Sequence, residues 1–268
     1  CKRFAAWLGR PPETATPDDV KYFQQHLVES GVSICTRNQT MTGVKFLFRV
    51  TLRRHDLVAE IFSLKEPVKV PLVLSKKEIK RILAMAPSTK AHVMLSLAYG
   101  CGMRAGEVVR LKVGDIDGEQ KIIRIVQSKG RKDRNVMLPV DVLDLLRDWW
   151  KERPTGQDKD MPAPERVLFP GYRGKHLSAR QVSRLFKETA GEAGITKPVT
   201  LHTLRHSFAT HLLERGVDIR VIQALLGHTK LTTTARYASV ATGMIAAVDS
   251  PLDDLNRVKR KKGKAGSS

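Results

Sequence analysis

Apolar residues recur three or four positions apart along most of the chain, a spacing that places them on one face of a helix. Ser, Thr or Asp residues suited to capping precede several of these runs, and Gly residues follow some of them. The pattern predicts helices at residues 17–31, 76–85, 90–99, 140–150, 178–191, 200–216 and 218–227, with another near 244–255. The remainder of residues 1–66 is also expected to be helical.

Two short segments, 122–127 and 134–138, are rich in β-prone residues and are joined by a basic turn that contains Gly130. This arrangement predicts a hairpin. Leu111 is expected to begin another β segment, and residues 167–170 are expected to form a short strand. We therefore predict a mainly α-helical chain with a small antiparallel β-sheet, an α+β fold.

The stretch from residue 65 to 73 contains two prolines and alternating charge, which is typical of a linker between domains. We place a helical N-terminal domain at 1–66, a linker at 67–73, a second domain at 74–250 and a basic tail at 251–268. Residue 1 is Cys rather than Met, so we expect the N-terminal domain to be truncated at its start. No signal peptide is visible in the sequence.

Charge narrows the class of partner. The chain has 47 Lys and Arg residues against 27 Asp and Glu residues, a formal net charge of +20. This excess favours a polyanionic partner, and its spread along the chain favours nucleic acid over a membrane. A basic face that serves only solubility is the alternative. Cys1, Cys35 and Cys101 are widely spaced, so they predict neither a disulfide framework nor a zinc site and suit a reducing cytosol.

The segment from Thr200 onward concentrates polar chemistry. His202 and Arg205 lie three residues apart, in the first turn of the helix that Thr200 is expected to cap. Cationic side chains oppose the helix dipole at that end, and a phosphate in front of the turn would remove the conflict. His206 is expected to point away from both residues and to be structural.

Two further polar residues follow this helix. His228 comes directly after the Gly that ends the next helix. Tyr237 lies nine residues further on, and we expect it on a short helix capped by the Thr232–Thr234 run. Because its surroundings are polar, Tyr237 is not expected to be a core residue.

These residues resemble the tyrosine recombinases, also called the phage-integrase family. The family pattern has His-x-x-Arg-His, then Leu-Gly-His, then a nucleophilic Tyr, and the chain matches each part in order. A Gly-x-Arg-x-x-Glu motif at residues 102–107 and the Ser-Lys-Gly turn at 128–130 extend the match over nearly the whole chain. The resemblance implies the following catalytic residues: Arg104, Lys129, His202, Arg205, His228 and Tyr237.

The assignments of Glu107 and Lys129 have local alternatives. Glu107 resembles the acidic partner that supports Arg104 from behind, whereas the plain alternative is a solvated Arg–Glu pair worth tenths of a kcal/mol. Lys129 matches the lysine that the family carries on this hairpin, and Lys132 is its nearest rival.

The resemblance also implies a mechanism. Tyr237 attacks the scissile phosphate, leaving a 3′-phosphotyrosyl link and a free 5′-hydroxyl. Arg104 and Arg205 hold the nonbridging oxygens, and His228 adds a donor to the same phosphate. Lys129 is the general acid toward the leaving oxygen. His202 is the base or positioning group for the phenol, whose free pKa is about 10.

The resemblance further implies the architecture and the partners. A helical, SAM-like core-binding domain precedes the catalytic domain, and its first helix is expected to be cut short. The partner is double-stranded DNA, bound by a chain that is monomeric when free and tetrameric in the synaptic complex. No metal, cofactor, ATP or membrane is expected, and the setting is the prokaryotic cytoplasm, with the chain on the nucleoid when bound.

Within the family, the compact second domain resembles the Xer and integron-integrase branch. The segments 193–198 and 250–253 are similar to those of integron integrases. The insertion that those enzymes carry before the His202 region is absent here. A recombinase of a mobile element from that wider branch is therefore the interpretation we adopt.

Four other functions compete with this interpretation. A type IB topoisomerase shares the chemistry, and an accessory DNA-binding protein would not need Lys129, His228 or Tyr237. A zinc hydrolase is suggested by His202, His206 and His211, but these lack the His-Glu-x-x-His spacing. A two-metal transposase needs clustered carboxylates, and Asp115 and Asp117 are better explained as turn residues.

Overall fold

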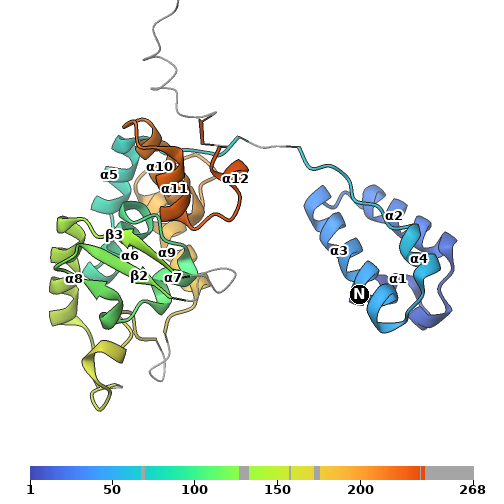
Figure 1. Ribbon diagram of the computed structural model, residues 1–268, viewed down its shortest axis with the longest axis horizontal. Coiled ribbons are helices and arrows are strands. Elements are labelled where there is room, and N and C mark those ends of the chain that lie inside the picture. Colours follow the sequence, from blue (N-terminus) through green and yellow to red (C-terminus); the bar gives the residue numbers. More distant parts are fainter. Residues whose placement is uncertain (68–69, 127–132, 157, 172–175, 236, 239–268) are drawn as a thin grey trace, which may run out of the picture. The chain divides into compact units, whose positions relative to one another are not determined.

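The computed structural model describes residues 1–67, 70–126, 133–156, 158–171, 176–235 and 237–238. The chain divides into two compact units, Cys1–Lys69 and Val70–Ser268 (Figure 1). The predicted hairpin loop with Lys129, the helix near 244–255 and the basic tail lie outside the described residues.

The first unit is built from helical segments around one apolar core. Thr16 caps the second helix because its hydroxyl accepts from the Asp19 N–H at 3.3 Å, and Pro17 occupies the first position, as predicted. The Phe4 ring meets Phe23 and Phe48 edge-on, with centroids 5.0 and 5.6 Å apart. The elements are α1 (Lys2–Leu8), η1 (Pro12–Thr14), α2 (Pro17–Glu29), α3 (Ile34–Phe46), η2 (Leu47–Thr51) and α4 (His55–Ala59).

The second unit is arranged around helix α6 (Thr89–Gly100), whose residues from Val93 to Ala98 are all buried. Such a helix is apolar on every side because other helices surround it. It contacts the helices α5 (Lys76–Ala84), α7 (Ala105–Arg110), α8 (Val140–Glu152), α9 (Ala179–Glu192) and α10 (Leu201–Leu213). None of the described helices has the length and apolar content that crossing a membrane requires.

A three-stranded antiparallel sheet completes this unit, in the order β1 (Ile116–Asp117), β2 (Ile122–Ile125), β3 (Arg134–Met137). Ile123 pairs with Ile116 on one side and Val136 on the other, which confirms the predicted hairpin and the mainly α fold with a small antiparallel sheet. The short helical turns η3 (Val113–Asp115) and η4 (Ala163–Glu165) lie outside the sheet.

Two strand predictions were wrong. The first strand begins at Ile116 rather than Leu111, because η3 intervenes and Leu111 packs in the core instead. Residues 167–170 contribute only isolated bridges, Lys112 to Val167 and Pro170 to His176. This apolar run of four residues is buried mainly by packing against helices, so it does not need a strand partner.

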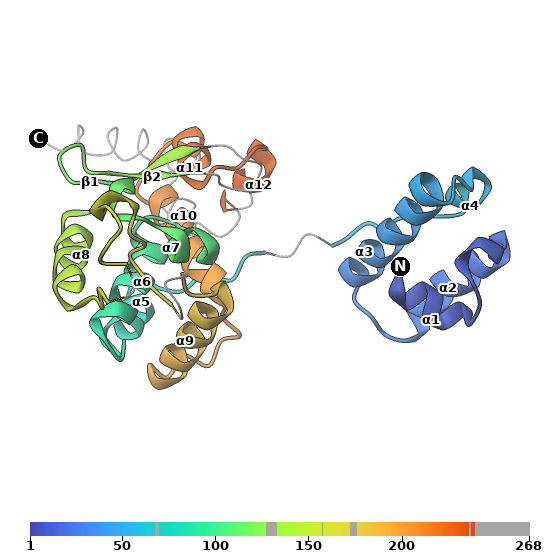
Figure 2. The same cartoon turned by 90° about the horizontal axis from the view of Figure 1, so that it is seen from below.

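Three helices near the C-terminal end of the described chain form a smaller cluster, in which α10 and α11 (Ile219–Leu226) lie side by side (Figures 1 and 2). Asp218 caps α11, and Gly227 ends it with φ 60°, as the sequence predicts. Helix α10 ends at Leu213, before the predicted stop at Gly216. The short α12 (Leu231–Ala235) follows, with the Thr232–Thr234 run inside it rather than capping it.

A buried carboxylate joins α7 to β3. Glu107 receives hydrogen bonds from Arg134 at 2.9 and 2.7 Å, and from the backbone N–H and side chain of Arg104 at 2.8 and 2.7 Å. Burial raises the pKa of Glu107, but these hydrogen bonds and the nearby charges outweigh it and hold the pKa at about 2. The carboxylate is therefore ionised in the folded protein. The Arg104–Glu107 pair is a partly buried ion pair rather than the solvated pair that was the alternative prediction.

We expect Gly102→Ala to destabilise the second unit strongly. Gly102 has φ +60°, and an added Cβ would lie 2.5 Å from Cδ1 of Phe208. The backbone penalty of about 1–2 kcal/mol is then joined by roughly 1–3 kcal/mol of overpacking. Gly194→Ala is the matched control, since Gly194 has φ +67° but open space around it. Urea unfolding should show the larger loss for Gly102→Ala; equal losses would contradict the packing argument.

The Glu107 site predicts a specific dependence of stability on pH. Because its pKa falls from 4.5 to about 2 on folding, its contribution is present above pH 4.5 and is lost as pH falls toward 2. The shift corresponds to about 3 kcal/mol. Glu107→Gln should lower the free energy of unfolding at pH 7 by about this amount, and should flatten the acid dependence.

The control for this measurement is Glu188→Gln, which removes a carboxylate that is 63% exposed in its side chain and pairs with Arg184. An exposed pair contributes about 0–1 kcal/mol, so little should change. If Glu107→Gln were as stable as wild type at pH 7, the buried carboxylate would not hold α7 to β3.

Candidate active site

Three guanidinium groups meet at the carboxyl end of α11. The Leu225 carbonyl accepts from Nε of Arg134 at 2.8 Å, and the Leu226 carbonyl accepts from Nη2 of Arg104 at 3.2 Å and from Nη2 of Arg205. The last carbonyls of a helix have no donor within the helix and carry partial negative charge. They therefore hold together cations that come from the start of α7, from β3 and from α10.

Arg205 is the most enclosed of the three, with 1% of its surface exposed. Its Nη1 donates to the Gly102 carbonyl at 2.6 Å, while its Nε has no hydrogen-bond partner among the described residues. Burial and the positive charge of Arg104 lower the pKa of Arg205 to about 9, against the opposing effect of Glu107. The group still carries its charge at pH 7.

Backbone groups account for part of the conflict between this cation and the amino end of α10. The carbonyls of Gly102 and Leu226 accept from two nitrogens of Arg205. The anion expected in front of this turn stays a prediction. The unpartnered Nε leaves one donor for a further acceptor.

His228 follows α11 directly and lies beside Arg205, as the sequence predicts. Its Nε2 is 3.3 Å from Nη2 of Arg205, and its Nδ1 is 2.9 Å from the Thr234 hydroxyl. A guanidinium can only donate, so Nε2 accepts and the ring proton is on Nδ1. Burial, followed by the charges of Arg205 and Arg104, lowers the pKa of His228 to about 4. The imidazole is neutral at pH 7.

Tyr237 differs from the prediction in two ways. It lies beyond the end of α12 rather than on that helix, and only 2% of its surface is exposed. The expectation that it is not a core residue was wrong, because its ring packs against apolar side chains of α10 and α11. These are Phe208, Ala209, Leu213, Ile222 and Leu226.

The predicted direction of His206 was also wrong. The Tyr237 hydroxyl lies 3.1 Å from Nδ1 of His206, and the His202 and His206 ring centroids are 4.5 Å apart. Residues four apart on a helix share a face, so His206 does not point away from His202. Burial, then the proximity of His202 and Arg205, lowers the pKa of His206 to about 4.

His202 begins the same face of α10 but remains an exposed residue. Partial burial, together with the charges of Arg205 and Arg104, lowers its pKa as well. His228 contacts Arg205, and its ring centroid is 6.3 Å from that of Tyr237. The imidazoles of His202, His206 and His228 therefore lie near the guanidinium groups and the phenol. Their lowered pKa values favour neutral rings at pH 7.

The structure therefore brings together all the predicted site residues that it describes: Arg104, Glu107, His202, Arg205, His228 and Tyr237. Lys129 and its rival Lys132 lie outside the described residues. Sequence reasoning missed Arg134 and Thr234, and it predicted the wrong direction for the His206 side chain. No spacing rule connects Arg134 to Glu107, because their contact depends on how β3 packs beside α7.

Histidines 202, 206 and 211 do not form the metal cluster that a zinc hydrolase would need. His211 instead places its Nδ1 2.9 Å from the Tyr99 hydroxyl. Within the ranges that the structure describes, no group of three or more His, Cys, Asp or Glu side chains is arranged to hold a metal ion.

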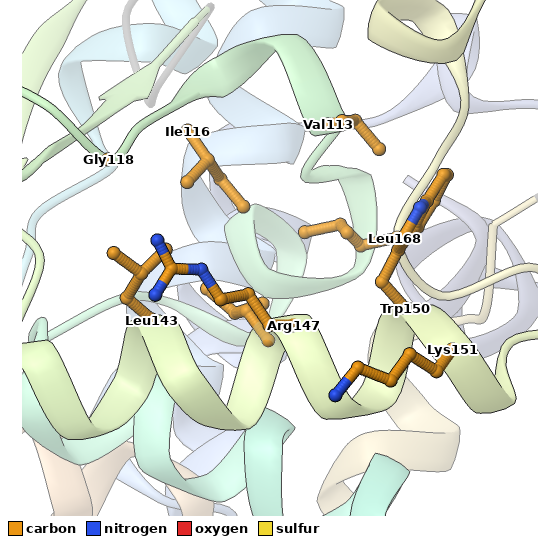
Figure 3. A pocket seen from close by; sticks show the side chains of 9 residues that line it. Val113, Ile116, Gly118, Leu143, Arg147, Trp150, Lys151 and Leu168 are labelled. Carbon is orange, nitrogen blue, oxygen red and sulfur yellow. The ribbon is translucent and has the colours of Figure 1, made fainter.

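An apolar hollow of about 490 Å³ lies apart from these residues, and Figure 3 shows Arg147 and Lys151 of α8 beside it. Val113, Leu143, Trp150 and others line it. No predicted site residue does so, and both of its cations already pair with carboxylates on α8. It is a gap in the packing between α8 and the η3–β1 segment rather than part of the polar site.

Comparison with known proteins identifies the family to which the chain is similar. Residues 73–244 match the phage integrase family, and residues 1–55 match the phage integrase N-terminal SAM-like domain. A Sinorhizobium fredii sequence assigned as an integrase/recombinase (y4qK) is 38% identical, over 95% of this chain and 80% of its own length. Tyrosine recombinase XerD of Ralstonia nicotianae is 34% identical, over 89% of this chain and 80% of its own.

Solved structures agree with the sequence relatives. XerA recombinase matches 99% of this chain and 90% of its own, with 27% identity and a TM-score of 0.56. XerH site-specific recombinase, bound to its difH substrate, matches 84% of this chain and 67% of its own, with 25% identity and a TM-score of 0.68. The integron-integrase part of the predicted resemblance stays a prediction. The chain belongs to the phage integrase family, the tyrosine recombinases.

Proposed function

We propose that the chain is a site-specific DNA recombinase that cuts and rejoins double-stranded DNA through a phosphotyrosyl link to Tyr237. The observation that carries the proposal is the meeting of a phenol, two guanidinium groups and neutral imidazoles at the carboxyl end of α11. The names of its relatives, which include Xer recombinases and a recombinase bound to its DNA substrate, support it.

The scissile phosphate would be held by Arg104 and Arg205. The Arg104 side chain is 24% exposed, and Nε of Arg205 has no hydrogen-bond partner within the described part of the chain. Planar guanidinium groups donate in pairs to phosphate oxygens, and a donor fixed in advance stabilises the charge that grows in the transition state. Glu107 fixes Arg104 from behind through the 2.7 Å contact to its Nη1.

The reaction exchanges one ester for another. The Tyr237 oxygen bonds to phosphorus, the bond from phosphorus to the 5′-oxygen breaks, and the phenol proton leaves for a base. The departing 5′-oxygen takes a proton from a general acid, which the resemblance assigns to Lys129. Because the ester is conserved as a 3′-phosphotyrosine, a 5′-hydroxyl can reverse the step without ATP.

His228 needs one change before it can help to hold the phosphate. Its Nε2 accepts from Arg205 in the free protein, so this atom carries no proton to donate. Donation to a phosphate oxygen requires the tautomer with the proton on Nε2, and the Thr234 hydroxyl, 2.9 Å from Nδ1, can then donate to the ring. A hydroxyl serves both tautomers because it donates or accepts.

The remaining assignments extend this function. The DNA partner fits the net charge of +20, which favours binding to a polyanion. We propose a monomer in solution and a tetramer on two synapsed sites, since each exchange needs four strands cut. The source would be a prokaryotic mobile element, with the protein acting in the cytoplasm on DNA of the nucleoid.

We expect Tyr237→Phe to abolish covalent attachment to DNA while leaving DNA binding intact, because only the attacking oxygen is removed. Wild-type protein should be captured on a library of bacterial genomic fragments as an adduct that survives denaturation. The variant should give no adduct but an unchanged retention of the recovered fragments on a native gel. Normal adduct formation by the variant would remove Tyr237 as the nucleophile.

Replacing Arg205 by Ala should slow cleavage by on the order of 10²–10³, as for loss of one donor to a transition-state oxyanion. Arg205→Lys should recover little, since an ammonium cannot donate in the paired geometry. The measurement is the single-turnover rate of adduct formation on a recovered duplex. Arg147→Ala, at a side chain 64% exposed on α8, is the control and should cleave normally. Near-normal cleavage by Arg205→Ala would exclude it from the site.

A further inference from the structure

We propose that His206, rather than the more exposed His202, holds the Tyr237 phenol and accepts its proton as Tyr237 attacks the DNA phosphate. The inference rests on the proposed function and deepens it by naming the base. It is carried by the 3.1 Å distance between Nδ1 of His206 and the Tyr237 hydroxyl.

The surroundings orient this contact. The Tyr237 ring is held by the apolar side chains of α10 and α11, so its hydroxyl cannot swing freely. The His206 ring lies 5.5 Å from the Tyr237 ring, with an angle of 53° between the planes. The His202 ring packs edge-on against the His206 ring, with centroids 4.5 Å apart, and this contact restricts rotation of the His206 imidazole. Proton transfer needs such fixed geometry within hydrogen-bond reach.

The charge around His206 leaves its ring neutral and able to accept. The groups that face it are His202 and Arg205 on α10, His228 after α11, and Tyr237 after α12. Burial and the two α10 groups disfavour the imidazolium. A neutral ring with its proton on Nε2 presents the Nδ1 lone pair to the phenol, and the phenol then donates to it.

Arrival of DNA makes this base stronger. A phosphate beside Arg104 and Arg205 offsets the positive charge that disfavours protonation of His206. The proton can then pass from the Tyr237 oxygen to Nδ1 while that oxygen bonds to phosphorus, and the imidazolium returns it when the 5′-hydroxyl reseals the strand. The same phosphate that is attacked therefore activates the base. When no DNA is bound, His206 is a weak base and the phenol stays protonated.

Two variants separate holding the phenol from accepting its proton. His206→Phe keeps a ring but loses the acceptor, and His206→Asn keeps an acceptor oxygen near the position of Nδ1 but cannot be protonated. Single-turnover adduct formation on a recovered duplex should fall by about 10²–10³ for His206→Phe. His206→Asn should fall less, because the phenol stays oriented.

The dependence of rate on pH distinguishes a base from a structural residue. The ratio of the wild-type rate to the His206→Asn rate should be largest at high pH. It should fall toward one as pH drops and the wild-type imidazole becomes protonated. A ratio that stays constant with pH would overturn the proposal, as would His206→Phe cleaving as fast as wild type.

His211→Asn is the matched control, since His211 is on the same helix and its Nδ1 lies 2.9 Å from the hydroxyl of Tyr99. It removes the same kind of contact away from Tyr237, and cleavage should stay within about twofold of wild type. A loss as large as that of His206→Phe would mean that any buried imidazole of α10 matters, and would overturn the specific role. If wild-type protein forms no adduct, the proposed function fails; if it does and the His206 variants match it, only this inference fails.

Discussion

The carboxyl end of α11 gathers the positive charge of the site. Its carbonyls at Leu225 and Leu226 accept from guanidinium groups of Arg104, Arg134 and Arg205. Packing like charges together in a partly buried place is costly, and partial negative charge at a helix end offsets only some of that cost. The ionised Glu107 carboxylate supplies most of the balance, because it contacts two of these three groups directly. A net positive charge is left over.

Burial and that residual charge together explain why the imidazoles are neutral. The pKa of His206 and that of His228 are each lowered to about 4, by burial first and by neighbouring positive charge second. Neutral rings can accept hydrogen bonds, one from Arg205 and the other from the phenol. A site that favours anions and keeps its imidazoles unprotonated suits a phosphate substrate and a hydroxyl nucleophile. The arginines therefore add to the effect of burial on the acid–base properties of the site.

Local rules in the sequence predicted much of this fold, and contacts between distant segments account for what they missed. Helical periodicity and end signals placed α5, α6 and α9–α11 nearly correctly, since caps such as Asp218 and Gly227 act locally. The burial of Tyr237 and the Glu107–Arg134 pair arise from packing between segments far apart in the chain. The misassigned direction of His206 could have been avoided, because its four-residue spacing from His202 already places the two on one face.

The burial of the site constrains how a phosphate can enter. Arg205 and Tyr237 are 1% and 2% exposed, whereas the Arg104 side chain is 24% exposed and His202 is an exposed residue, so a phosphate would approach past Arg104 and His202. Both arginines donate to the Leu226 carbonyl, and a phosphate oxygen is a stronger acceptor for guanidinium than a neutral carbonyl. DNA binding would therefore exchange one acceptor for another at the end of α11. The helix end would then hold the arginines in place beforehand and release them to the substrate.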